Sequence, residues 1–329
     1  MTIGCSGWIK RVAVVCVGIG SLVGASAIAG ANELDPELPS FERVPGVSGS
    51  LKSMGSDTML NVMTHWQEAF REFYPNVRIE VEGKGSSSGP PALIKGQAQF
   101  APMSRAMKAE ETSAFVDAFS YEPTQLRVGV DCLAIFVHKD CPLDDISLED
   151  VERVFSVTSE PLKWSDLGVT DVRYSDEFVS LYGRNSASGT YGYFKEVALA
   201  GHDFKATVKE QAGSSGVVRA VGADPFGMGY SGIGFTSPNV KALRVSAFGD
   251  EAAPPDATHA FDGTYPLARF LYVYINHDPA RALDPLRAAF VRFMLSRDGQ
   301  ASLLKDGYIA LPSEVAFEEL EKVGLDLEG

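Results

Sequence analysis

Four times along this chain, a short apolar segment with the composition of a strand ends in a loop of small hydroxyl or glycine residues, and a helical pattern follows at once. Strands that alternate with helices in this way predict open, mostly parallel sheets with helices on both faces. Ligands of such sheets bind outside the carboxyl ends of the strands, where all four loops are expected to lie. The loops are Gly55-Ser56-Asp57-Thr58, Gly85-Ser86-Ser87-Ser88-Gly89, Met103-Ser104-Arg105 and Arg184-Asn185-Ser186-Ala187-Ser188-Gly189-Thr190.

Apolar spacing predicts the individual elements. A helix that ends before Pro75 is predicted by an apolar face made of Met59, Leu60, Met63, Trp66, Phe70 and Phe73. Strands are expected at 51–54, 77–81, 97–101, 126–138, 178–182 and 271–275, with a tight strand or turn at 228–234. Further helices are expected to begin near Pro90 and Ser147 and to cover 108–119, 191–200, 214–221 and 283–295.

The four loops have the chemistry of an oxyanion site. The start of a helix leaves backbone N–H groups without partners and carries a partial positive charge, so such a loop binds anions with few lysines. Arg184 adds a planar fork of donors, and Gly189 lets the backbone approach an anion closely. Two alternatives stay open: Arg184 forms an ion pair with a nearby acid, and Arg105 is a surface arginine and not an anion contact.

The first 31 residues have the pattern of a secretory signal peptide. Lys10 and Arg11 precede an apolar run from Val12 to Val23, and small residues follow as far as Ala31. The alternative is a membrane anchor, but the run is shorter than the ~20 apolar residues that a spanning helix needs. Loss of this segment takes the formal net charge from −14 to −16. Such an acidic surface repels nucleic acids and anionic membranes.

Cys132 and Cys141 are the two cysteines that follow the predicted leader. In an oxidising compartment an even pair predicts a disulfide, while the alternative is that Cys132 only packs within an apolar strand. The spacing of histidine, cysteine and acidic residues does not predict a metal site, and no cofactor is expected. Residues 32–49 are rich in proline, glycine and acid and are expected to form an arm or linker.

From about Ser50 to Pro312 the chain resembles the periplasmic substrate-binding proteins of bacterial phosphate ABC transporters. Arginine followed after three residues by Ser-Gly-Thr, at Arg184 to Thr190, is the specific part of this resemblance. The weaker matching stretches are 55–58, 83–88, 211–216, 229–232 and 265–269.

The resemblance implies a type II binding protein, a monomer with two α/β lobes joined by two crossing segments. Lobe 1 would comprise residues 50–127 and 266–329, and lobe 2 would comprise residues 128–265. Inorganic phosphate would be captured between the lobes in the periplasm and delivered to the permease of an ABC transporter. The residues assigned to phosphate are Ser56, Asp57, Thr58, Ser86, Ser87, Ser88, Ser104, Arg105, Arg184, Ser188, Gly189 and Thr190.

One departure from the family pattern concerns selectivity. Relatives commonly carry an aspartate after a serine in a loop of the first lobe, where it accepts the proton of phosphate and rejects sulfate. Here that stretch is Met103-Ser104-Arg105 and holds no acid. Either selectivity is relaxed or another acid serves. Asp57 is the candidate acceptor, and the equal alternative is that Asp57 caps the helix that begins at Met59.

Two other classes of function compete with transport. The loop Gly85 to Gly89 also fits the nucleophile elbow of α/β-hydrolases, with Ser87 as nucleophile and a partner among the later histidines, which are His138, His202, His259 and His277. The residues around these histidines do not indicate a catalytic role, so the chain is not expected to be an enzyme. The other class is a phosphate or oxyanion binder that scavenges or senses without a transporter.

Overall fold

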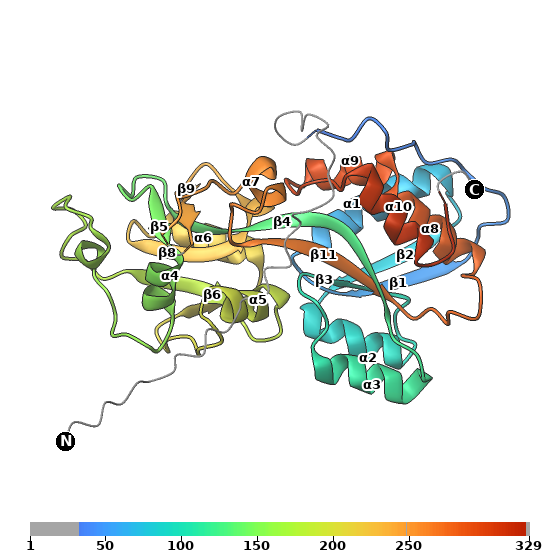
Figure 1. Cartoon of the computed structure of the whole chain (residues 1–329), viewed down its shortest axis with the longest axis horizontal. Coiled ribbons are helices and arrows are strands. Elements are labelled where there is room, and N and C mark those ends of the chain that lie inside the picture. Colours follow the sequence, from blue (N-terminus) through green and yellow to red (C-terminus); the bar gives the residue numbers. More distant parts are fainter. Residues whose placement is uncertain (1–32, 248, 327–329) are drawn as a thin grey trace, which may run out of the picture.

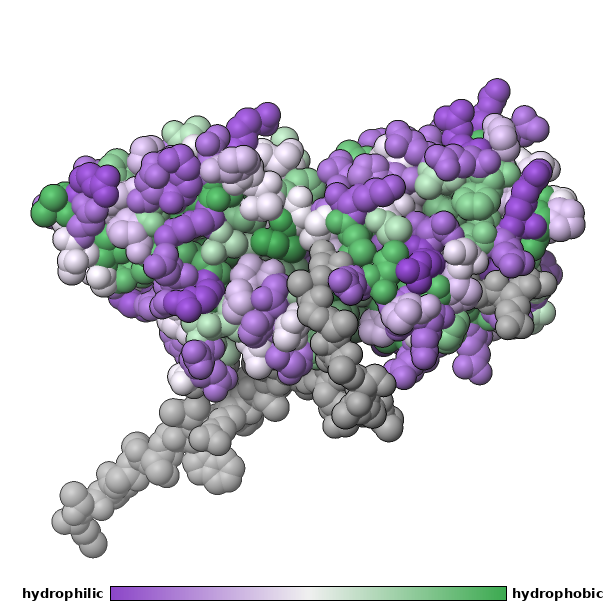
Figure 2. Space-filling model, turned by 90° about the horizontal axis from the view of Figure 1, so that it is seen from above, coloured by the Kyte–Doolittle hydropathy of each residue, from purple (hydrophilic) through white to green (hydrophobic). Residues whose placement is uncertain are grey.

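The computed structural model describes residues 33–247 and 249–326, and its elements form two groups joined by two long strands. These strands are β4 (Thr124–His138) and β11 (Ala268–Ile275), which run from one group toward the other in Figure 1. The space-filling view shows two masses with a notch between them (Figure 2). Among the described residues, helices with the length and apolar character needed to cross a bilayer are absent.

The first group of elements is built from both ends of the described chain. Its N-terminal elements are β1 (Ser50–Gly55), α1 (Leu60–Phe73), β2 (Arg78–Gly83), η1 (Ser86–Ser88), α2 (Gly89–Ile94), β3 (Phe100–Met103) and α3 (Ala109–Phe119). Its C-terminal elements are α8 (Pro285–Leu295), α9 (Arg297–Lys305) and α10 (Ser313–Glu321). We call this group the first lobe.

The second lobe holds the elements between the two crossing strands. Its first part contains β5 (Asp145–Ser147), α4 (Leu148–Phe155), η2 (Trp164–Leu167), β6 (Ser180–Arg184), α5 (Gly189–Val197) and β7 (Lys209–Gln211). Its second part contains α6 (Ser214–Ala223), β8 (Gly227–Gly232), η3 (Ile233–Phe235), β9 (Val240–Ala242), β10 (Arg244–Ser246) and α7 (Ala257–Phe261).

One mixed sheet runs through both lobes. In the described chain its strand order is β2-β1-β3-β11-β4-β8-β6-β7, with β9 also paired to β4. The pairs β1–β2, β1–β3, β6–β8 and β6–β7 are parallel, as the alternation of strands and helices predicted. The antiparallel pairs involve the crossing strands: β11 pairs with β3 and β4, and β4 pairs with β8 and β9. The parallel arrangement therefore describes the outer part of each lobe.

The apolar stripe predicted from periodicity is the core-facing side of α1. Met63, Trp66 and Phe70 are fully buried, and the Trp66 indole N–H donates to the Gly299 carbonyl oxygen at 2.7 Å. Burial of each such side chain contributes about 1.5–3 kcal/mol to stability. The helix ends at Phe73, two residues before the helix-breaking Pro75.

The segment before β1 has no regular element, but it is packed against the first lobe. Phe41 is buried, and its ring lies 5.5 Å from the ring of Phe293 in α8 and 6.0 Å from that of Phe70 in α1. The Phe41 amide donates to Asp298 at 2.7 Å, and Asp35 accepts from the Ser313 amide at 2.8 Å. Both ends of the described chain are thereby fixed to the same lobe.

The predicted disulfide is wrong. Cys132 and Cys141 are both free and buried. Cys132 lies within β4, which continues as far as His138, so about 20 Å of extended strand at ~3.3 Å per residue separates Cys132 from the end of β4. Burial raises the pKa of both thiols, which keeps them protonated. The predicted signal peptide, residues 1–31, lies outside the described residues.

Candidate functional site

The four loops predicted from the sequence meet where the two lobes face each other. Each follows a strand, in the order β1, β2, β3 and β6, and three lead into the helical segments α1, η1 with α2, and α5. The backbones touch directly: the Ser87 amide of the first lobe donates to the Ala187 carbonyl oxygen of the second at 3.3 Å. A site at this junction is therefore made by both lobes.

Six hydroxyl side chains from these loops are buried together, and we call them the hydroxyl cluster: Ser56, Thr58, Ser86, Ser104, Ser188 and Thr190. Ser104 Oγ lies 3.2 Å from Ser56 Oγ and 3.4 Å from Ser86 Oγ. Across the lobes, Thr58 Oγ1 lies 2.9 Å from Thr190 Oγ1. Burial of polar groups is costly unless they are hydrogen-bonded. Because six hydroxyls are buried in one place, we interpret the cluster as a binding site.

Gly189 is required at its position by the close approach of the hydroxyl cluster. A Cβ atom placed on Gly189 would lie 2.2 Å from Ser86 Oγ and 2.6 Å from Ser104 Oγ, both shorter than real contacts. Gly189 is the first residue of α5, and the N-cap Ser188 accepts from the Thr190 amide at 3.2 Å. The start of α5 can thus bring its backbone against the first lobe.

Arg184 places a cation beside the hydroxyl cluster. Its side chain is 2% exposed, and Nη2 lies 2.5 Å from Asp57 Oδ1 across the lobes. Nη1 donates to Ser214 Oγ at 2.8 Å, and the backbone amide donates to the Tyr230 hydroxyl at 3.2 Å. Within the described part of the chain, buried Nε has no hydrogen-bond partner. The guanidinium therefore retains a donor for a further acceptor.

Asp57 does not cap α1. The helix begins at Leu60 with Met59 as its N-cap, and no side-chain hydrogen bond caps it. The Asp57 backbone oxygen accepts from the Leu60 amide at 3.1 Å, while the carboxylate reaches Arg184. The capping alternative is therefore wrong. The ion pair that was the alternative for Arg184 is observed. Its acidic partner is Asp57, which lies in the loop from Gly55 to Thr58.

Two buried tyrosines hold the backbone of these loops. Tyr230 accepts from the Arg184 amide, and Tyr308 donates to the Thr58 carbonyl oxygen at 2.7 Å. Burial raises the pKa of both phenols, so both stay neutral. The Tyr230 ring is also stacked 3.9 Å from that of Phe194 in α5, which fixes β8 against the helix that carries the Ser-Gly-Thr turn.

Three predicted site residues have other partners. Ser88 Oγ donates to the Gly85 carbonyl oxygen of its own turn at 2.7 Å. Both terminal nitrogens of Arg105 donate to Glu111, each at 2.7 Å, and Nη2 also donates to Ser87 Oγ at 3.0 Å. Arg105 is 8% exposed and thus not a surface arginine, and its charge is matched by Glu111.

The arrangement around Ser87 differs from a hydrolase triad. The Ser87 hydroxyl accepts from Arg105. The four later histidines have other partners, as in His277 with Arg281, His259 with Asp256 and His202 with Glu152. Groups of three or more side chains suited to a metal ion are also absent from residues 33–247 and 249–326.

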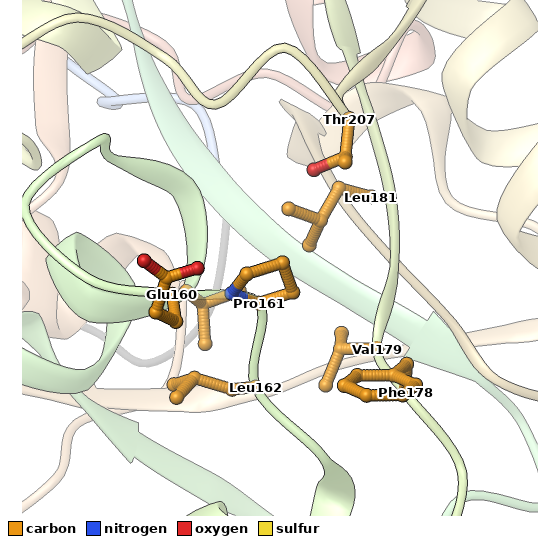
Figure 3. A pocket seen from close by; sticks show the side chains of 8 residues that line it. Glu160, Pro161, Leu162, Phe178, Val179, Leu181 and Thr207 are labelled. Carbon is orange, nitrogen blue, oxygen red and sulfur yellow. The ribbon is translucent and has the colours of Figure 1, made fainter.

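A cavity of about 550 Å³ lies in the second lobe, away from the hydroxyl cluster, next to β6. Figure 3 shows the side chains of Leu162, Phe178 and Leu181 around it. Glu160 and Thr207 contribute its polar side-chain groups, and a carboxylate repels anions. The hydroxyl cluster and Arg184 supply hydrogen-bond donors, which suit a small oxyanion better than the lining of this cavity does.

Sequence reasoning missed three polar residues at the site. Ser214 binds Arg184, and Arg269 forms a buried ion pair with Asp131, with 2.7 Å between Nη2 and Oδ2. Ser214 and Arg269 lie in two of the stretches that resemble the phosphate-binding family. The sequence around them does not indicate which residues they contact. Asp131 stands within the apolar run of β4, and a lone acid in such a run was the one signal available.

The fold is a two-lobed α/β protein of the binding-protein type, with the hydroxyl cluster and Arg184 between the lobes. Residues 42–298 match the model of the PBP superfamily domain. The phosphate-binding protein PstS of Pseudomonas aeruginosa is 46% identical over 318 residues, which cover 94% of this chain and 96% of that protein. The chain belongs to the PBP superfamily and, within it, to the family of the phosphate-binding proteins PstS.

A more distant relative and a solved structure also match this chain. The phosphate-binding protein PstS of Staphylococcus haemolyticus is 25% identical over 306 residues, which cover 92% of this chain and 94% of that protein. Among solved structures, an ABC-type phosphate transport receptor from Vibrio cholerae matches with a TM-score of 0.64 and 22% identity, covering 79% of this chain and 100% of that one. This structural likeness supports the fold.

Proposed function

We propose that this chain captures inorganic phosphate between its lobes and delivers it to the permease of an ABC transporter. The observation that carries the proposal is the buried Arg184 guanidinium beside the hydroxyl cluster, with donors from both lobes. A guanidinium fork matches two phosphate oxygens, and hydroxyls and helix-start amides fit the others. The PstS relatives support phosphate as the ligand, since their names state that they bind it.

Each lobe supplies part of the proposed site. The second lobe gives Arg184, Ser188, Gly189 and Thr190, and the first gives the loops around Thr58, Ser86 and Ser104. In full, the residues proposed to surround phosphate are Ser56, Asp57, Thr58, Ser86, Ser87, Ser88, Ser104, Arg105, Arg184, Ser188, Gly189 and Thr190. Those that have no partner in the hydroxyl cluster, such as Ser88 and Arg105, would line its edge.

Asp57 is the proposed acceptor for the proton of phosphate. Its carboxylate lies 2.5 Å from Arg184, the residue expected to hold the anion. A carboxylate can accept a hydrogen bond from a protonated oxyanion, whereas a fully deprotonated one such as sulfate presents only lone pairs to it. Asp57 would therefore take the place of the aspartate that the segment around Ser104 lacks.

The proposed mechanism is capture without chemistry. Residues 50–127 and 266–329 would form one rigid body and residues 128–265 the other, with a hinge in the crossing segments. Phosphate would meet one lobe first, and closure would complete its shell of donors, because only differential contact in the closed state can shift the equilibrium. The closed monomer would present the surface that a permease recognises.

The N-terminal sequence supports export. We propose that residues 1–31 are removed as a signal peptide and that the mature chain acts in the periplasm. Its acidic net charge would not help to hold an anion, so binding would depend on local donors and Arg184.

The proposal is tested by calorimetric titration of residues 32–329 with phosphate and sulfate in parallel. We expect phosphate to bind and sulfate to bind far more weakly, by a factor on the order of 100. In Asp57→Asn, the preference for phosphate over sulfate is expected to fall by about tenfold or more, because an amide can donate to sulfate. Arg219→Ala, an exposed arginine on α6, is the control and should change neither affinity.

Failure of phosphate to bind would refute the proposed ligand. An unchanged preference in Asp57→Asn would refute the role of Asp57 alone. Delivery is tested separately, because phosphate-loaded protein should stimulate ATP hydrolysis by the reconstituted transporter, whereas a scavenger or sensor should not.

A further inference from the structure

Arg269 is bound by groups of both lobes at the point where the crossing strands pass between them. It lies on β11 and is 6% exposed. Nη1 donates to the Ser104 carbonyl oxygen at 2.8 Å, and Nη2 donates to Thr190 Oγ1 at 3.0 Å. One guanidinium thus joins the Ser104 segment of the first lobe to the Ser-Gly-Thr turn of the second.

Asp131, on β4, holds this guanidinium in place. Its Oδ2 accepts from Arg269 Nε at 3.0 Å and from Nη2 at 2.7 Å, and Oδ1 accepts from the Ile233 amide at 3.3 Å. Asp131 is fully buried, and the Tyr193 ring lies 5.2 Å from the guanidinium carbon. Burial of either charge alone would be costly, so the two side chains constrain each other.

The contact with Arg269 restricts what the Thr190 hydroxyl can do. A guanidinium only donates, so Thr190 Oγ1 can only accept from Arg269, and the Thr190 proton stays available for another acceptor. Thr58 Oγ1 lies 2.9 Å away, and either of these two hydroxyls can donate to the other. Ser86 Oγ is oriented in the same way, since it accepts from the Ser104 amide at 3.1 Å. An oxyanion oxygen without a proton can only accept, so it needs hydroxyls set as donors.

We propose that Arg269, held by Asp131, is a positioning residue that sets the Thr190 hydroxyl as a donor to the anion. This inference rests on the proposed function, because phosphate is its ligand. Arg269 acts through Thr190 and not by its own contact with phosphate. The hydrogen bond from Arg269 to the Ser104 carbonyl oxygen holds the Thr190 hydroxyl in a fixed position relative to the first lobe.

The test is a double-mutant cycle read by calorimetric titration with inorganic phosphate. Arg269→Lys keeps a positive charge opposite Asp131 but loses the fork that reaches Thr190. We expect it to weaken phosphate binding by about tenfold, within the range of coupling seen in shared hydrogen-bond networks. In a Thr190→Val background, which lacks the hydroxyl, the same change should weaken binding by less than about threefold.

Thr190→Ser serves as the matched control because it keeps the hydroxyl. In that background Arg269→Lys should again weaken binding about tenfold. Thermal unfolding of every variant is measured alongside. Should Arg269→Lys not fold, Arg269→Gln combined with Asp131→Asn removes both charges together and takes its place in the same three backgrounds.

The outcomes separate the two proposals. An equal loss of affinity in all three backgrounds would overturn the inference, because Arg269 would then act through the fold in general. Unchanged affinity in Arg269→Lys alone would overturn it as well. If the unsubstituted protein bound no phosphate, the proposed function itself would fail, whatever the variants did.

Discussion

Replacement of Arg184 by alanine removes the cation from the proposed phosphate site. Arg184 is buried, lies 2.5 Å from Asp57 Oδ1 and donates to Ser214 Oγ at 2.8 Å. Truncation of one partner of a buried, hydrogen-bonded charge pair costs roughly 2–5 kcal/mol of binding free energy. At ~1.4 kcal/mol for each factor of ten, phosphate affinity should fall by about 30-fold to several thousand-fold.

The fold should survive this substitution. Asp57 loses its partner, but its side chain is 13% exposed and can be hydrated in part, so the free energy of unfolding should fall by only about 1–3 kcal/mol. The backbone contact between Arg184 and Tyr230 does not depend on the side chain. Circular dichroism and thermal unfolding without ligand check this part of the prediction.

Calorimetric titration with phosphate is the assay, with Arg219→Ala as the exposed control on α6. Arg184→Lys should give an intermediate loss, because it keeps the charge and loses the planar fork. A dissociation constant for Arg184→Ala within about threefold of the unsubstituted value would refute the reasoning. Loss of a buried charge from an anion site should reduce the binding free energy by more than that.

Two further predictions concern Gly189 and Asp306. Gly189→Ala should weaken phosphate binding by at least about tenfold, because the added Cβ would meet Ser86 and Ser104 in the arrangement of the lobes described here. In the proposed mechanism the lobes separate without ligand and relieve this contact, so unliganded stability should stay equal or rise slightly, since alanine favours the helix. Calorimetry and thermal unfolding measure the two effects, and equal affinity would contradict the role given to this close approach. Burial raises the pKa of the Asp306 carboxyl, so its ionised form opposes folding above its unfolded pKa. Asp306→Asn should therefore raise the Tm at pH 7, and the gain should vanish as the pH falls below about 3.9; a gain that does not depend on pH would exclude this cause.

Local pattern was enough to predict most of the elements. Periods of 3.6 and 2 residues depend only on neighbouring side chains, so α1 (Leu60–Phe73), the long strand β4 (Thr124–His138) and α8 (Pro285–Leu295) were predicted within a few residues of their observed bounds. The helices α9 (Arg297–Lys305) and α10 (Ser313–Glu321) were not predicted, since their apolar positions are few and tertiary packing supplies their partners.

The site was predicted as a set of loops but not as a set of contacts. Sequence order places each loop after a strand, and parallel strands bring their carboxyl ends to one edge, so the convergence of hydroxyls and Arg184 followed from topology. The partner of Asp57 could not be predicted this way. Whether a short acidic side chain caps its own helix or reaches another lobe is decided by distances that the local sequence does not contain.

By itself, the sequence determined the alternation of strands and helices, the polar loops between them and the donor chemistry that suits an oxyanion. Only the tertiary structure decided that Thr58 meets Thr190, 132 residues away, that Arg269 pairs with Asp131, 138 residues away, and that Cys132 and Cys141 stay apart. The physical reason is range: backbone preference and periodicity act over a few residues, whereas these pairings depend on the order of strands in the sheet and on how the two lobes pack.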